Sequence, residues 1–170
     1  MKEKTPLIIS GSARGEGDTK LYLDLIFNSP YKRVINLLDF NICHYTYDAK
    51  YPTTDEFDKL VNEILKHDTI IFATPVYWYS MSGHMKILFD RFTDLVTIKK
   101  EVGRKLKGKS ILLFAVGADP EIPEGFEIPF KLTAKYLDMK YKGYIYFNTQ
   151  KDSLKEQKSD RVKQFLNKFP

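Results

Sequence analysis

Cysteine is nearly absent from this chain of 170 residues, which contains only Cys43. One cysteine excludes an intramolecular disulfide, and it excludes any zinc site or iron–sulfur cluster built from four thiolates. No metal site is therefore expected. A chain without disulfides fits a reducing compartment, and its first residues lack the hydrophobic core and cleavage site of a signal peptide. We expect a cytoplasmic protein.

Long hydrophobic runs and blocks of like charge are also missing. The longest aliphatic and aromatic run covers residues 111–116, which is far too short to cross a bilayer. The net charge of +5 arises from lysines that are spread along the chain among acidic residues. Scattered lysine indicates a solvated surface rather than a nucleic-acid groove. Neither a membrane nor a nucleic acid is expected as a partner.

Three common nucleotide and hydrolase motifs are absent too. A P-loop requires a lysine directly before its serine or threonine, but Asp18 precedes Thr19 here. The dinucleotide fingerprint would need its third glycine where Lys20 stands. A nucleophile elbow requires a glycine two residues before its serine, whereas Ser82 has another serine there. Triphosphate binding, Rossmann-type dinucleotide binding and serine hydrolysis therefore have no support.

What the chain does contain is a regular alternation of strand-like and helix-like segments over a length that suits one domain. Continuous apolar runs predict five strands, at residues 6–9, 33–37, 69–73, 110–116 and 142–147. Helical spacing of apolar residues predicts helices from about residue 18, at 57–65, at 85–95, at about 129–137, and at the end of the chain. Such alternation implies an α/β protein with a parallel sheet that is covered by helices on both faces.

Capping residues indicate where three of these helices begin. Thr53 with Glu56 has the spacing of a capping box, in which a hydroxyl and a carboxylate three residues apart satisfy the first helical amides. Ser153 with Glu156 repeats that spacing before the terminal helix. Ser82 can cap the helix that follows it.

The loop after the first strand has the composition of an anion site. Its three glycines let the backbone approach an anion closely, and it leads into a helix N-terminus with unpaired amides. Ser10, Ser12 and Thr19 add hydroxyl donors, and Arg14 can pair bidentately with a phosphate. We interpret the loop as a phosphate site; the alternative is a polar turn with Arg14 in solvent.

Three consecutive aromatic residues follow the third strand, namely Tyr77, Trp78 and Tyr79. Ligands of parallel sheets bind beyond the carboxyl ends of the strands, where large aromatic side chains suit a flat heteroaromatic ring. A packed loop or a subunit contact would also account for them.

The segment 74–91 resembles that of NAD(P)H-dependent FMN reductase-like flavoproteins. Their pattern is Pro-Val/Ile-Tyr-Trp, then Ser-x-Ser-Gly, then Lys, then Asp-Arg. The chain carries this pattern as Pro75 to Trp78, Ser80 to Gly83, Lys86, and Asp90 with Arg91. The loop 10–19 is similar to the phosphate loop of the same family, and the resemblance extends from the first strand to the fifth.

This resemblance implies a flavodoxin-like three-layer sandwich with a five-stranded parallel sheet in the order 2-1-3-4-5 and helices on both faces. Residues 1–170 would form a single flavodoxin-like FMN-binding domain. By the same resemblance, the ligands of FMN are Ser10, Ser12, Arg14 and Thr19 at the phosphate, Pro75, Val76, Tyr77 and Trp78 along the isoalloxazine ring, and Gly117 and Ala118 in a third loop. Tyr79 stands where many relatives have glycine, so we expect it on the substrate side of the ring.

The implied activity is an oxidoreductase reaction, in which hydride passes from NADPH or NADH through FMN to a small acceptor such as a quinone, an azo compound or free flavin. Flavin chemistry requires no side-chain nucleophile, so no catalytic residue is assigned. A homodimer or a tetramer is implied, with contacts through the aromatic loop and the helix at 85–95. Two alternatives stay open: a flavodoxin-type electron carrier, and a non-enzymatic flavin-binding regulatory module.

Overall fold

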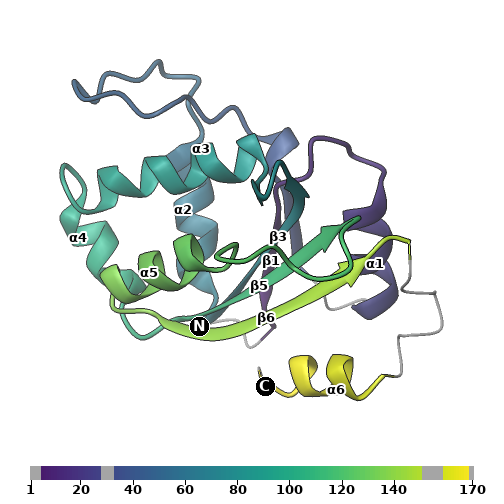
Figure 1. The fold of residues 1–170 in the computed structure, drawn as a ribbon. Helices are drawn as coiled ribbons and strands as arrows, with labels where there is room; N and C mark the ends of the chain where they lie inside the picture. The colour runs from purple at the N-terminus through teal and green to yellow at the C-terminus, as the bar shows by residue number, and fades with distance from the viewer. Residues whose placement is uncertain (1–4, 28–32, 151–158, 169–170) are drawn as a thin grey trace.

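The computed structural model describes residues 5–27, 33–150 and 159–168. Its sheet contains five parallel strands, β1 (Leu7–Ser10), β2 (Arg33–Asn36), β3 (Thr69–Tyr77), β5 (Ser110–Gly117) and β6 (Lys140–Asn148). They lie in the order β2-β1-β3-β5-β6 (Figure 1). Counted along the chain, the parallel strands therefore follow the predicted order 2-1-3-4-5. The order reverses between β1 and β3, which is where such sheets bind ligands.

Helices cover both faces of this sheet and divide the apolar core into two clusters (Figure 1). On one face lie α2 (Phe57–Lys66), α3 (Gly83–Arg91) and α5 (Ile128–Tyr136). On the other face lie α1 (Asp18–Ile26) and α6 (Asp160–Leu166). Strand alternation produces the division, because Ile9 of β1 belongs to the first cluster and its neighbour Ile8 to the second.

Short helical segments fill the connections on the α3 side. They are η1 (Leu37–Asp39), η2 (Phe92–Leu95), α4 (Lys100–Gly103) and η3 (Arg104–Leu106). The single helix predicted at 85–95 is thus divided into α3 and η2. Within the described ranges, no helix is long and apolar enough to span a membrane.

The third strand is longer than predicted and forms an unpredicted hairpin. It continues past Ala73 to Tyr77 and pairs antiparallel with β4 (Ser80–Met81). Trp78 and Tyr79 form the two-residue turn, with φ angles of 48° and 63°. Two positive φ angles at such a turn are typical of type I′ hairpins, which normally use Asn-Gly. The aromatic pair therefore carried no turn signal that sequence patterns could detect.

The helix caps agree with the prediction in one case and differ in another. The hydroxyl of Ser82 accepts a hydrogen bond from the Met85 amide at 3.2 Å and caps α3, as predicted. The capping box of Thr53 and Glu56 is wrong, because Glu56 is itself the N-cap residue of α2. Its carboxylate accepts a hydrogen bond from the Asn41 amide at 3.0 Å and so binds a neighbouring segment instead.

The terminal helix begins at Asp160, and the hydroxyl of Ser159 accepts from the Val162 amide at 3.4 Å. The predicted capping box of Ser153 and Glu156 lies outside the described residues.

Candidate functional site

A cleft of about 270 Å³ opens at the carboxyl ends of β1, β3 and β5. Three loops that are far apart in the sequence meet there, as the strand order requires. The lining residues are Ser12, Arg14, Gly17, Asp18 and Thr19 after β1, Pro75, Val76 and Tyr77 in β3, Val116, Gly117 and Ala118 at the end of β5, and Thr149 after β6. The cleft therefore lies at the predicted switch point.

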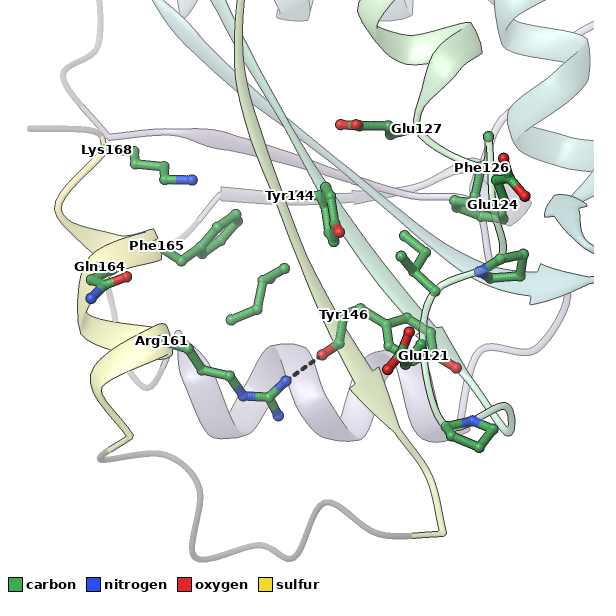
Figure 2. Close-up of a pocket in the computed structure, with 15 residues that line it drawn as sticks. Glu121, Glu124, Phe126, Glu127, Tyr144, Tyr146, Arg161, Gln164, Phe165 and Lys168 are labelled. Carbon is green, nitrogen blue, oxygen red and sulfur yellow. Dashed lines mark hydrogen bonds between the residues drawn. The ribbon is translucent and has the colours of Figure 1, made fainter.

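A larger hollow, of about 740 Å³, lies between the 120–127 segment, β6 and α6 (Figure 2). Glu121, Glu124 and Glu127 contribute three carboxyl groups to its wall, against the cationic Arg161 and Lys168. The carboxylates outnumber the cations in this hollow, whereas the smaller cleft sets one carboxylate, that of Asp18, against Arg14 and a helix N-terminus. The smaller cleft is therefore the better candidate for an anionic ligand.

The N-terminus of α1 forms the anion-binding end of this cleft. Its N-cap residue is Gly17, which has no side chain to satisfy the first-turn amides, and the first helical bond runs from the Leu21 amide to the Gly17 carbonyl at 2.9 Å. Thr19 is buried beside these amides. The hydroxyl of Ser12 accepts a hydrogen bond from the Arg14 amide at 3.2 Å, which folds the loop around the helix end. Uncapped amides and a guanidinium at one helix N-terminus fit a phosphate group.

Most of the predicted cofactor residues line the cleft, and two do not. Ser10 is buried within β1, where it pairs with its neighbours in the sheet. Trp78 lies at the tip of the hairpin and is 93% exposed. Tyr79, the predicted substrate-side residue, lies beside it and is 69% exposed. The eight other predicted residues meet in the cleft.

The hairpin tip holds these two aromatic side chains in an unfavourable backbone conformation. Left-handed φ angles cost about 1–2 kcal/mol for residues other than glycine. Trp78 and Tyr79 both adopt them while most of their surface stays in solvent. Because both side chains are so exposed, packing against the described residues does not offset this cost. Strained and exposed aromatic residues of this kind are candidates for a contact with a ligand or a partner subunit.

Ser82 fastens the hairpin to the phosphate loop. Its amide donates to the Thr74 hydroxyl at 3.0 Å, and its own hydroxyl donates to the Gly11 carbonyl. A Cβ atom at Gly11 would lie 3.0 Å from Met85 and from the Ser82 hydroxyl. Glycine at this position therefore allows the loop after β1 to approach the start of α3.

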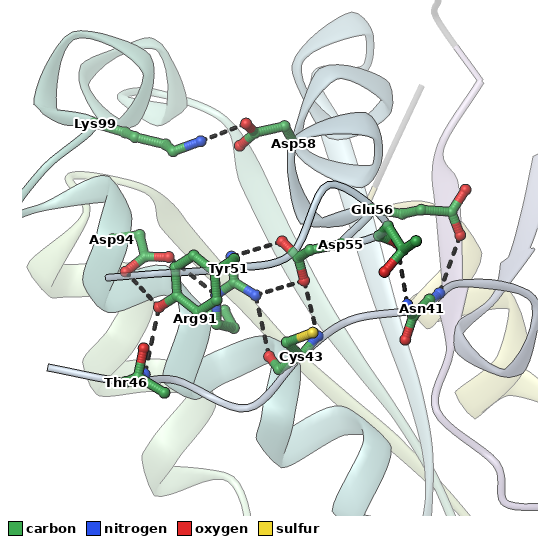
Figure 3. A network of polar contacts seen from close by, with 11 residues as sticks. Asn41, Cys43, Thr46, Tyr51, Asp55, Glu56, Asp58, Arg91, Asp94 and Lys99 are labelled. Atoms are coloured by element: carbon green, nitrogen blue, oxygen red, sulfur yellow. Dashed lines mark hydrogen bonds and ion pairs between the residues drawn. The ribbon is translucent and has the colours of Figure 1, made fainter. Parts of the chain in front are cut away.

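A buried ion cluster at the other end of α3 gives a structural role to the arginine of the Asp-Arg motif (Figure 3). Arg91 is 1% exposed, and its guanidinium donates to both carboxylate oxygens of Asp55, at 2.8 and 2.9 Å. Its Nε donates to Asp94 at 2.9 Å, and one terminal nitrogen donates to the Cys43 carbonyl at 3.0 Å. The guanidinium lies 3.6 Å from the centre of the Tyr51 ring.

This cluster fastens the long segment between η1 and α2 to the α3 side of the fold. Cys43 lies in that segment and is half-buried, and burial and then Asp55 raise the pKa of its thiol. Throughout the described ranges, no three His, Cys, Asp or Glu side chains are placed to bind a metal ion.

Two further residues near the cleft carried no sequence signal. Tyr146 and Asn148, at the end of β6, both donate hydrogen bonds to the backbone of the loop after Gly117. Their position depends on the pairing of β6 with β5, which no local pattern encodes.

Comparison with known proteins places the chain in a defined group. Residues 6–164 match the family model described as NADPH-dependent FMN reductase. A Bacillus subtilis protein named as an NAD(P)H-dependent FMN-containing oxidoreductase is 30% identical over 98 residues, which cover 55% of this chain and 54% of that protein. An iron–sulfur flavoprotein of Methanocaldococcus jannaschii is 31% identical over 123 residues, which cover 65% of this chain and 60% of that protein. The chain thus spans little more than half the length of these relatives.

A solved structure shows the same fold. General stress protein 14 of Treponema denticola, in complex with FMN, superposes with a TM-score of 0.68 at 21% identity and covers 96% of both chains.

Proposed function

Because the chain belongs to the NADPH-dependent FMN reductase family, whose cofactor is FMN, we propose that it is an oxidoreductase that passes hydride from NADPH or NADH to a small acceptor. The observation that supports this most is the cleft, which combines an uncapped helix N-terminus and Arg14 with the aromatic end of β3. Bound FMN supplies the redox chemistry, and the protein supplies binding and orientation.

Residues of the three loops would bind different parts of FMN. Ser12, Arg14 and Thr19, with the first amides of α1, would bind the phosphate. One such cradle and no second phosphate site in the cleft favour FMN over FAD. The backbone and side chains of Pro75 to Tyr77, with Gly117 and Ala118, would lie along the ring and leave one ring face open.

The decisive experiment is the visible spectrum of the purified protein before and after anaerobic addition of NADPH. We expect a yellow protein whose flavin absorbance bleaches on addition. Flavin that bleaches only beside a separate reductase would favour the electron carrier, and a colourless protein that takes up no FMN would favour the regulatory module. The pI of about 9.1 already speaks against a carrier, since flavodoxin-type carriers are usually acidic.

The acceptor that we propose is a quinone, an azo compound or free flavin, because Tyr77 lines the cleft, Trp78 and Tyr79 follow it at the exposed hairpin tip, and aromatic rings suit planar molecules. We also propose a cytoplasmic location, on the ground that the chain has a single cysteine.

A homodimer, or a tetramer built from it, is the oligomeric state that we propose. The hairpin tip is exposed, but the predicted contact through the helix at 85–95 is not supported, because its apolar residues Met85, Leu88, Phe92 and Leu95 are buried in the core. Exposed apolar surface lies instead on α5, where Ile128, Leu132 and Tyr136 form a stripe. A row of exposed apolar side chains along one helix suits a contact with a partner subunit. Light scattering at micromolar concentration with FMN bound should give at least twice the 19.9 kDa chain mass. A monomer peak would contradict this assignment.

Ping-pong kinetics are expected, because the nicotinamide and the acceptor would stack in turn on the same open face of the ring. Tyr79→Gly should change the KM of one of them while FMN affinity stays nearly the same. Glycine tolerates the positive φ, so this variant should fold at least as stably as the wild type. The exposed Tyr47, replaced by glycine, is the matched control. Intersecting double-reciprocal lines, or loss of FMN in Tyr79→Gly, would refute the scheme.

A further inference from the structure

The loop that follows β5 is held from one side by the end of β6. The side-chain amide of Asn148 donates to the Asp119 carbonyl at 2.6 Å and lies 3.5 Å from the Ala118 carbonyl. The hydroxyl of Tyr146 donates to the same Asp119 carbonyl at 2.8 Å. The amide of Thr149, which follows β6, donates to the Gly117 carbonyl at 2.8 Å. The carbonyls of Gly117, Ala118 and Asp119 thus all accept hydrogen bonds from the end of β6 or from the residue that follows it.

The orientation of these carbonyls determines where the loop amides point. In a trans peptide the C=O of one residue and the N–H of the next point in opposite directions, and the described residues contain no cis peptide. The amides of Ala118 and Asp119 therefore point away from β6, and neither donates to another described residue. The third peptide leads to Pro120, which has no N–H. Ala118 itself lines the cleft.

Burial and hydrogen bonding of Tyr146 and Asn148 fix this arrangement of the loop. Tyr146 and Asn148 are 7% and 4% exposed, so their polar groups need partners inside the fold. The Oδ1 of Asn148 accepts from the Gln150 amide at 2.7 Å, which directs its NH₂ group toward the loop. A Cβ atom at Gly117 would lie 2.8 Å from the Tyr146 hydroxyl, so the absence of a side chain there lets the hydroxyl reach Asp119.

We propose that Tyr146 and Asn148 are positioning residues of the cofactor site, which aim the Ala118 and Asp119 amides at the ring of bound FMN and so favour its reduced form. Two successive amides that point the same way create a local positive potential. Reduction places additional negative charge on the flavin ring, and fixed donors stabilise charge where it develops. The proposal rests on the proposed function, since it requires FMN in the cleft.

The test measures FMN affinity and the two-electron midpoint potential in the wild type, in Tyr146→Phe and in Tyr146→Phe/Asn148→Ala. The double variant should lose about tenfold more affinity for reduced FMN than for oxidised FMN. Tenfold corresponds to a fall of about 30 mV in the potential of bound FMN. The phenylalanine variant keeps the ring and should show a smaller fall in the same direction. In the wild type, the Ala118 and Asp119 amides should gain hydrogen-exchange protection when FMN binds.

Tyr141→Phe is the matched control, because it also removes a β6 hydroxyl with a 2.8 Å hydrogen bond, here to Glu127, at the opposite end of the strand. It should leave the potential unchanged. Potentials in both test variants equal to that of the wild type would overturn the inference and leave the proposed function standing. A wild type that binds no FMN would overturn both. Equal shifts in the control and the test variants would show a general loss of packing and would also overturn the inference.

Discussion

Replacing Arg14 with alanine is expected to weaken FMN binding at least tenfold. Arg14 lines the cleft beside the uncapped N-terminus of α1, where its guanidinium can form a charge-assisted bond to the phosphate. Such bonds contribute about 1.5–3 kcal/mol, and 1.4 kcal/mol corresponds to a factor of ten. Calorimetric titration of the apoprotein with FMN measures the effect directly.

A nearby cation provides the control for this substitution. Lys20 stands in the first part of α1 but is paired with Glu16 and Asp24, at 3.1 and 3.2 Å, and it does not line the cleft. Lys20→Ala removes the same charge and should change FMN affinity much less. Equal losses in the two variants would show that the net field, rather than a contact from Arg14, attracts FMN. Unchanged affinity in Arg14→Ala would remove its assigned role.

Replacing Arg91 with leucine should lower the free energy of unfolding by about 3–5 kcal/mol, because breaking a buried pair leaves the remaining charge without a partner. Here two carboxylates, those of Asp55 and Asp94, would lose their cation while 8% and 1% exposed. Urea denaturation measures the change. Lys99→Ala, which removes an ion pair with Asp58 whose side chains are 30% and 61% exposed, should cost less than about 1 kcal/mol. Similar losses in both variants would contradict the importance of burial.

The same cluster predicts how stability depends on pH. Burial would raise the pKa of Asp55, but hydrogen bonds from Arg91 and from the Cys43 amide outweigh it and hold the pKa below its usual range. A lowered pKa in the folded state contributes stability above the ordinary aspartate range, and this is lost as the pH falls through the folded-state value. The free energy of unfolding should therefore decline below about pH 4, and less steeply in Asp55→Asn.

Local patterns predicted the elements of the fold well wherever one side-chain period or one cap decided the structure. The buried runs of β3 and β5 and the Ser82 cap are of this kind. The β3–β4 hairpin was missed because its turn uses Trp78 and Tyr79 where turn chemistry favours glycine and asparagine. The capping box at Thr53 failed because Glu56 is engaged by the Asn41 amide, a contact made outside the helix.

The residues of the site divide in the same way, into those whose position follows from local sequence and those whose position depends on contacts between distant segments. The sequence could place Arg14 and Thr19 at the cleft because a loop and a helix start are local features. The partners of Arg91 could not, since Asp55 lies 36 residues away and meets it only after α3 has packed. Tyr146 lies 27 residues from the carbonyl that it holds, and strand pairing alone brings the two together.

Because the cleft forms from loops after three separate strands, the lifetime of the chain in the cell should depend on the supply of its cofactor. The loops after β1, β3 and β5 converge only when the parallel sheet has formed, so an unfolded chain offers no FMN site. A ligand that binds only the folded state adds about 2.7 kcal/mol of stability at one hundred times its dissociation constant. In a flavin-poor cell the apoprotein would open more often and would be degraded sooner. The abundance of the protein would then follow flavin availability without any dedicated regulator.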